Sequence, residues 1–111
     1  MWEIKETSPS EQLRHGHAVT VTPSVAVPLT TTPTKPVLNR GIVVRAPGAG
    51  DAVPNVDTVW IGRAGVTPDQ NVGTGGMPLL PGASMELPLD DLSQVYIVSL
   101  SANQDVAWMG A

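Results

Sequence analysis

Apolar and polar residues alternate in short segments along the C-terminal part of the chain, and loops rich in glycine and proline separate these segments. In "RGIVVRA", for example, Ile42 and Val44 occupy alternate positions. Successive side chains of a strand point to opposite faces, so this spacing predicts strands that each bury one face. The segments expected to form strands are residues 40–46, 56–67, 83–88, 94–100 and 106–110.

Turn signals lie between the expected strands. Pro81 and Gly82 suit the two central positions of a type II turn, because proline fixes φ and glycine accepts a positive φ. Residues 89–94, "LDDLSQ", predict one helical turn or a polar corner with Asp90 or Asp91 as its cap. About six strands at roughly ten-residue spacing favour an all-β fold, either a small antiparallel β-sandwich or a jelly-roll-like barrel.

Residues 18–38 have a different composition, with six Thr, four Pro, no Gly and one charged residue. Proline removes a backbone donor and biases its predecessor towards extended backbone, so a central strand is excluded here. We therefore predict an extended N-terminal arm over residues 1–38 and a β-sandwich domain over residues 39–111. The arm is either a plain linker or a segment that lies along another subunit, and its alternating valines favour the second. The residues expected to contact a partner through this arm are Trp2, Ile4, Val19, Val21, Val25 and Val27.

The composition argues against several classes of function. The net charge is −4 and the six Lys and Arg residues are scattered, whereas nucleic-acid binding requires clustered basic residues. No apolar run approaches the roughly 20 residues of a membrane span. Residues 1–12 show neither a basic nor an apolar region, so no secretory signal is expected. The chain has no Cys, which excludes disulfides and thiolate metal sites and fits assembly in a reducing cytoplasm.

Candidate catalytic and metal-binding residues are few. His15 and His17 in "RHGHA" offer two imidazoles, but a structural zinc site takes about four ligands and the chain has no third His. Asp90 and Asp91 are adjacent and point in different directions, which favours a capping role over acid–base catalysis. Residues 73–76, "GTGG", lack the Lys that follows in a phosphate-binding loop. We therefore expect no enzymatic activity, no metal and no cofactor.

Three aromatic residues lie in separate expected strands, namely Trp60, Tyr96 and Trp108. They could line a sugar-binding face, as in a carbohydrate-binding module. Aromatic residues on separate strands belong more often to a core or an interface, because Trp and Tyr bury a large area and keep one polar tip. We therefore assign these three residues to the core or to a subunit interface.

Residues 56–111 resemble a pattern that recurs in small virion proteins of tailed bacteriophages. In this chain the pattern reads "VDTVWIGRAGVT", then "GGMPLLPGASMELPLDDLSQVYIVS", then "VAWMGA". The likeness lies in a strand that ends in W-I-G, a G-x-P-L-x-P-G turn, an L-x-x-V-Y strand and a closing V-x-W-x-G strand. It extends loosely to Arg40 and does not cover residues 1–38. These motifs are structural, and no active site is implied by them.

The resemblance implies a β-sandwich, often oligomeric, that decorates heads or forms fibre and adaptor parts of the virion. It favours a capsid decoration (cement) protein that binds the major capsid protein and is located in the virion after assembly in the bacterial host cytoplasm. A head-fibre component or a tail or neck adaptor is the alternative of the same class, and a carbohydrate-binding module is the alternative of another class. Poorly protected edge strands favour a homo-oligomer. The resemblance favours a trimer, while the residues themselves do not choose between a dimer and a trimer.

Overall fold

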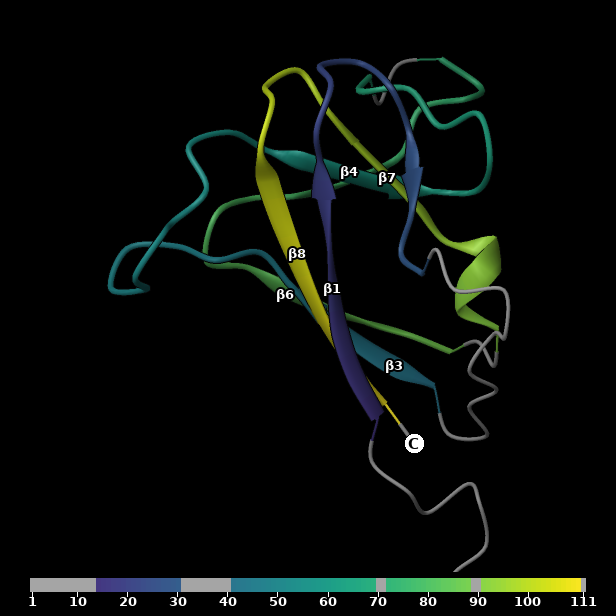
Figure 1. Cartoon of the computed structure of the whole chain (residues 1–111). Coiled ribbons are helices and arrows are strands. Elements are labelled where there is room, and N and C mark those ends of the chain that lie inside the picture. The colour runs from purple at the N-terminus through teal and green to yellow at the C-terminus, as the bar shows by residue number, and fades with distance from the viewer. Residues whose placement is uncertain (1–13, 31–40, 70–71, 89–90, 111) are drawn as a thin grey trace, which may run out of the picture.

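Two antiparallel sheets of four strands each pack face to face and form a β-sandwich (Figure 1). The computed structural model describes residues 14–30, 41–69, 72–88 and 91–110. Within these residues the elements are β1 (Arg14–Thr20), β2 (Val27–Pro28), β3 (Ile42–Arg45), β4 (Val59–Gly62), β5 (Met77–Leu79), β6 (Ser84–Leu87), the 3₁₀ helix η2 (Leu92–Gln94), β7 (Tyr96–Ser99) and β8 (Gln104–Gly110). The predicted all-β fold, a small antiparallel sandwich, is confirmed.

Neighbouring strands within a sheet come from distant parts of the chain. The first sheet has the order β1-β8-β3-β6, and the second has the order β2-β7-β4-β5. Among the described strands, every connection except the one from β4 to β5 therefore crosses between the sheets. Strands β1 and β8, of seven residues each, pair along their whole length, from Arg14 opposite Gly110 to Thr20 opposite Gln104.

The core lies between the two sheets and consists mainly of Val, Ile and Leu. Burial alternates along β3 as the sequence predicts, since Ile42 and Val44 are buried while Val43 and Arg45 are exposed. β7 is a central strand of the second sheet, also as predicted, and Ile97 on it is fully buried. Removal of apolar side chains from water is the main stabilising term in folding, so this alternation specifies which face of each strand turns inward.

The helical turn predicted over residues 89–94 is present as η2. Asp91 is its N-cap, and the Asp91 side chain accepts a hydrogen bond from the Ser93 N–H at 3.0 Å. Such a bond satisfies a backbone donor that the first turn of a helix leaves without a partner. Asp90, the other predicted cap, lies outside the described residues.

The predicted turn at Pro81 and Gly82 also has the expected geometry. Gly82 has φ 85°, and the Ala83 N–H donates to the Leu80 carbonyl at 2.9 Å. The turn leads into β6, whose Met85 and Leu87 pack against the core while Ser84 and Glu86 are exposed. A local signal of proline followed by glycine was therefore sufficient to place this connection.

The described part of the predicted arm belongs to the sandwich, which corrects the domain boundary at residue 39. Residues 14–20 form β1, an edge strand of the first sheet, and Val27–Pro28 form β2, an edge strand of the second. Leu29 is 2% exposed and lies in the core. Over residues 14–30 the chain is therefore part of the folded domain and not a separate arm.

The positions of the prolines explain why residues 14–30 form edge strands where an extended arm was predicted. Pro23 lies in the loop between β1 and β2, and Pro28 lies in a two-residue edge strand. A missing backbone donor is tolerated at both kinds of position. The prolines exclude a central strand in this part of the chain, as predicted, but they do not exclude edge strands.

Replacement of Gly48 by Ala is expected to destabilise the turn between β3 and β4. A Cβ on Gly48 would lie 2.5 Å from the Cα and 2.6 Å from the N of Gly82, and backbone atoms cannot rotate away. We expect Gly48→Ala to lower the free energy of unfolding by about 1–3 kcal/mol in a urea titration, the usual cost of overpacking. Gly73→Ala is the matched control, because nothing lies within 4 Å of a Cβ there. Equal losses for the two variants would contradict this prediction.

Candidate protein-binding surface

Hydrogen bonds connect three loops of the sandwich, and we call residues 21–26, 53–58 and 100–103 the loop end. The first loop joins β1 to β2, the second leads into β4, and the third joins β7 to β8. The first and third lie side by side at the top of Figure 1, where the Ser24 N–H donates to the Ser99 carbonyl at 2.7 Å.

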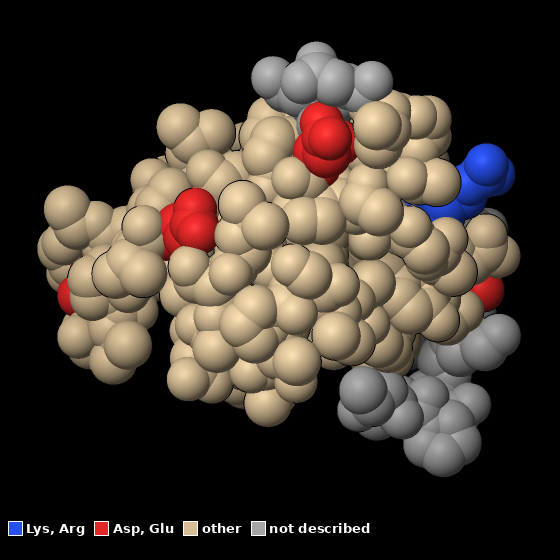
Figure 2. All heavy atoms as spheres, turned by 90° about the horizontal axis from the view of Figure 1, so that it is seen from above, with Lys and Arg blue, Asp and Glu red and all other residues tan. Residues whose placement is uncertain are grey.

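Large apolar side chains are exposed on all three loops. They are those of Val21, Val25, Val53, Val56 and Leu100, and the valines at 53 and 56 are 79% and 82% exposed. Charged groups are few here: Figure 2, which views the molecule from above, shows mostly uncharged residues with separate acidic groups among them. Exposed apolar side chains that gather on one part of a protein, with few charges among them, mark a contact surface for another macromolecule.

One buried glutamine joins two of these loops. Gln104 is the first residue of β8 and is 4% exposed. Its Oε1 accepts hydrogen bonds from the backbone N–H groups of Val56 at 2.8 Å and of Asp57 at 3.0 Å. Its Nε2 donates to the Ala102 carbonyl at 2.9 Å. Both polar atoms of this side chain therefore form hydrogen bonds within the loop end.

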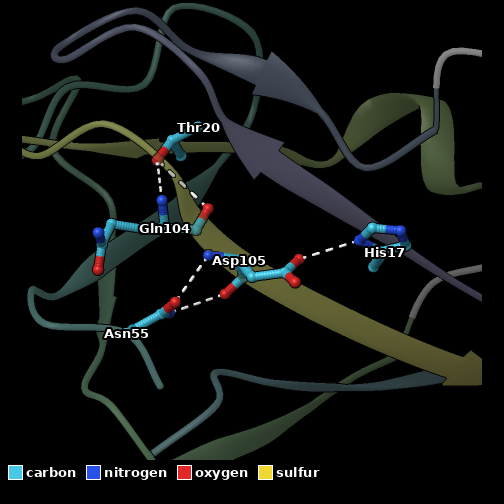
Figure 3. A network of polar contacts seen from close by, with 5 residues as sticks. All are labelled: His17, Thr20, Asn55, Gln104 and Asp105. Atoms are coloured by element: carbon cyan, nitrogen blue, oxygen red, sulfur yellow. Dashed lines mark hydrogen bonds and ion pairs between the residues drawn. The ribbon is translucent and has the colours of Figure 1, made fainter. Parts of the chain in front are cut away.

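Thr20 and Asn55 extend this network along β8 (Figure 3). The Thr20 hydroxyl accepts from the Gln104 N–H at 3.1 Å and donates to the Ser101 carbonyl at 3.2 Å. The Asn55 side chain bonds both backbone groups of Asp105: Nδ2 donates to the carbonyl at 2.8 Å, and Oδ1 accepts from the N–H at 2.7 Å. Asn55 therefore takes the place of a strand partner beside β8, and it anchors the loop that carries Val56.

Two residues at this end have a left-handed backbone conformation, Ser24 with φ 62° and Asn103 with φ 61°. Asn adopts this conformation more readily than Ser does, so Ser24 is the more unusual of the two. The Asn103 N–H donates to the Thr20 carbonyl at 2.6 Å, which helps to hold the β7–β8 connection. Strained conformations of this kind are often found at binding sites, where the surrounding structure enforces them. Loops held in this way lose little further entropy on binding.

Replacement of Gln104 by Leu is expected to loosen the loop end. Leucine keeps the approximate volume but removes the hydrogen bonds to the N–H groups of Val56 and Asp57, and loss of an ordinary hydrogen bond costs about 0.5–1.5 kcal/mol. We expect a loss of that order in the free energy of unfolding and faster amide hydrogen exchange at both residues. Val43→Leu, at an exposed position of β3, should change neither. Unaltered exchange at the two amides would show that Gln104 does not hold this loop.

Only part of the predicted partner-contacting set lies on the loop end. Val21 and Val25 have exposed side chains in the β1–β2 loop. Val19 and Val27 are half-buried in β1 and β2, and Val27 packs against the core. Trp2 and Ile4 lie outside the described residues. A partner contact by any of these residues stays a prediction.

The three aromatic residues do not share one face. Trp108 is 8% exposed and belongs to the core, which is one of the two environments that the sequence predicts. Trp60 and Tyr96 are half-buried on β4 and β7 of the second sheet. Trp60 lies opposite Val98 and Tyr96 opposite Gly62, so the two aromatic residues are diagonal neighbours on the face that turns away from the core. Their assignment to a subunit interface stays a prediction.

The histidines of "RHGHA" project from the exposed face of β1. His17 Nδ1 lies 3.1 Å from Asp105 Oδ1. Within the part of the chain that the structure describes, no group of three or more His, Cys, Asp or Glu residues is placed to hold a metal ion. In the same residues no helix is long and apolar enough to cross a membrane.

The residues that hold the loop end carry little sequence signal. Gln104 is the exception, because the alternation through "QDVAWMG" places its side chain on the same face as those of Val106 and Trp108. A polar side chain at a core-facing position requires hydrogen-bond partners, and this requirement points to a network. Asn55 and Thr20 have no comparable signal, since their partners are distant in the sequence.

Comparison with known proteins provides no further guide to function. No family model, no curated protein and no solved structure matches this chain.

Proposed function

We propose that this chain is a structural protein of a tailed-bacteriophage virion, namely a capsid decoration (cement) protein that binds the major capsid protein and stabilises the head lattice. It acts as a homo-oligomer, is located in the virion, and has no enzymatic activity. The bacteriophage assignment is supported by the motifs of residues 56–111. The observation that carries the binding role is the loop end, with its five exposed Val and Leu side chains on hydrogen-bonded loops.

The chemistry of the loop end suits a large, uncharged partner surface. Its apolar side chains gain free energy from burial, about 25 cal/mol per Å² of apolar area removed from water. Because few charges lie on this surface, screening by salt should have little effect on binding. Attachment to capsids is therefore expected to persist at high ionic strength.

The copy number in purified virions tests the proposed role. Stained gels should show this chain at a level comparable to that of the major capsid protein, because a decoration protein occupies repeated lattice positions. A copy number far below that of the capsid protein would indicate a head-fibre component or a tail or neck adaptor instead. Absence of the chain from purified virions would overturn the virion role altogether.

A substitution in the loop end tests the binding surface. Val56→Asp places a carboxylate among the exposed apolar side chains, and burial of an unpaired charge at an interface is costly. We expect at least tenfold weaker binding to capsids that lack the protein. Val43→Asp is the matched control, since Val43 is exposed on β3 and outside the loop end. Equal binding by the two variants would show that the contact lies elsewhere.

A carbohydrate-binding module is the second candidate, and one observation favours it. Trp60 and Tyr96 are neighbours on the outward face of the second sheet, where they could stack on a sugar ring. Glycan-array binding that Trp60→Ala abolishes would support this alternative. No binding by the natural chain across the array would exclude the sugars tested.

A further inference from the structure

We propose that two copies of this chain pair through β1, so that their first sheets join into one continuous antiparallel sheet about a two-fold axis. This inference deepens the homo-oligomer part of the proposed function and does not depend on the capsid role. The partner is a second copy of the same chain, and the surface is the free edge of β1 together with the groove beside it.

The four edge strands differ in how well they are protected against pairing. An edge strand exposes backbone N–H and C=O groups and can template another strand unless it is short, charged or interrupted by proline. β2 has two residues including Pro28, and β5 has three including Pro78. β6 has four residues, carries Glu86 and is followed by Pro88. β1 has seven residues, Arg14–Thr20, without Pro, and Arg14, its one Lys or Arg residue, stands at the end of the strand.

Small side chains in the middle of β1 leave room for another strand. Within the described residues β1 pairs with β8 on one side only. The indole of Trp108 lies across Gly16, and glycine leaves the space for it. A Cβ on Gly16 would be 2.9 Å from three indole atoms. The next residue on that face is Ala18. Within the described residues, no strand therefore covers the free edge of β1.

An apolar groove of about 500 Å³ lies between β1 and β2. Apolar residues that line it are Ala18, Val19, Val21, Val27, Leu29 and Trp108, of which Leu29 and Trp108 are already buried in the single chain. In a two-fold pair through β1, the grooves of the two copies face each other, so pairing removes both from water. Strand pairing supplies directional hydrogen bonds, and the grooves supply the apolar area that stabilises the contact.

Charge and symmetry favour the antiparallel orientation. A parallel pair in register would place the two Arg14 side chains next to each other, whereas an antiparallel pair over the full strand, centred on His17, places each Arg14 opposite Thr20 of the other copy. Like charges in directly opposite positions destabilise a strand pair. An antiparallel contact between identical strands is also closed after two subunits and does not extend into a filament. The edges of this sandwich therefore favour a dimer over the trimer that the resemblance implies.

A cysteine scan of β1 tests the contact directly. Because the natural chain contains no Cys, a single introduced Cys forms only intermolecular disulfides. His15→Cys, His17→Cys and Val19→Cys are made one at a time in the full chain and exposed to mild oxidation. A residue at the two-fold axis faces its symmetry mate with about 4.5–5.5 Å between Cα atoms, which is within reach of a disulfide. We expect one of the three to give a crosslinked dimer and Val43→Cys, on central strand β3, to give none.

Sedimentation equilibrium provides the second measurement. At micromolar concentration the natural chain should have twice the mass of one 11.6 kDa chain. His17→Lys, which adds a cation to the β1 edge, should be monomeric with an unchanged circular dichroism spectrum, and Val43→Lys should remain dimeric. A monomeric or trimeric natural chain would overturn the proposal. It would also be overturned by a dimer that crosslinks neither in the three single variants nor in mixtures of the His15→Cys with the His17→Cys chain and of the His17→Cys with the Val19→Cys chain, which report an axis at Gly16 or Ala18. If His17→Lys does not fold, the cysteine scan still decides. Virion copy number tests the capsid role separately.

Discussion

A chain that begins at Asn39 is expected to be unfolded. It lacks β1 and β2, and each sheet therefore loses an edge strand. It also lacks Leu29, which is 2% exposed in the core. Truncation of one buried Leu to Ala costs about 2–5 kcal/mol, while the whole stability of a small domain is about 5–15 kcal/mol. Loss of two strands and this core residue together should exceed the stability available, so circular dichroism should show neither strand signal nor a cooperative thermal transition.

A chain that begins at Arg14 is the matched control for this truncation. It retains all eight described strands and is expected to unfold cooperatively. The domain boundary at residue 39 predicts the opposite result, a stable β-rich protein from Asn39 onward. A cooperative transition in the shorter chain would show that β1 and β2 are dispensable for the fold.

Replacement of Trp108 by Ala is expected to be the most damaging single substitution among the aromatic residues. The Trp108 indole is 8% exposed, belongs to the core and lies against Gly16 on the neighbouring strand. Removal of a buried Trp side chain typically costs about 3–5 kcal/mol, because the cavity that remains is only partly filled by relaxation. Urea unfolding of Trp108→Ala should therefore show a midpoint far below that of the natural chain.

Trp60→Ala is the comparison variant for this experiment. Trp60 is half-buried on the outward face of the second sheet, so its removal should cost clearly less than removal of Trp108. The same residue type is deleted in both variants, and the difference between them reports the environment of each side chain. Similar losses for the two would contradict the assignment of Trp108 alone to the core.

The strands that the sequence predicts are those whose signal is local. In β3 and β6, large apolar residues alternate with polar or exposed ones, and a proline–glycine turn leads into β6. β1 has no such signal, because the inward positions of "RHGHAVT" include Gly16 and Ala18, which are too small to register as an apolar face. A glycine at position 16 is explained by the Trp108 indole that lies against it, and Trp108 is far away in the sequence.

The candidate binding surface was predictable to a smaller extent. Val21 and Val25 stand out in the sequence as apolar residues in a proline-rich segment, and the structure places both in an exposed loop. Val53, Val56 and Leu100 do not stand out, because exposure of an apolar loop residue depends on the tertiary structure around it. The network beneath them depends on pairs such as Asn55 with the backbone of Asp105, which no local pattern encodes.

The position of β8 has a consequence for protein synthesis. This strand lies between β1 and β3, yet it consists of residues 104–110. During translation, β1 leaves the ribosome long before its partner exists, and the first sheet cannot be completed until those residues have also emerged. Folds dominated by contacts between distant residues form slowly. Polypeptides released before residue 104 therefore lack the strand that joins β1 to β3, and incomplete translation products should be degraded rather than assembled.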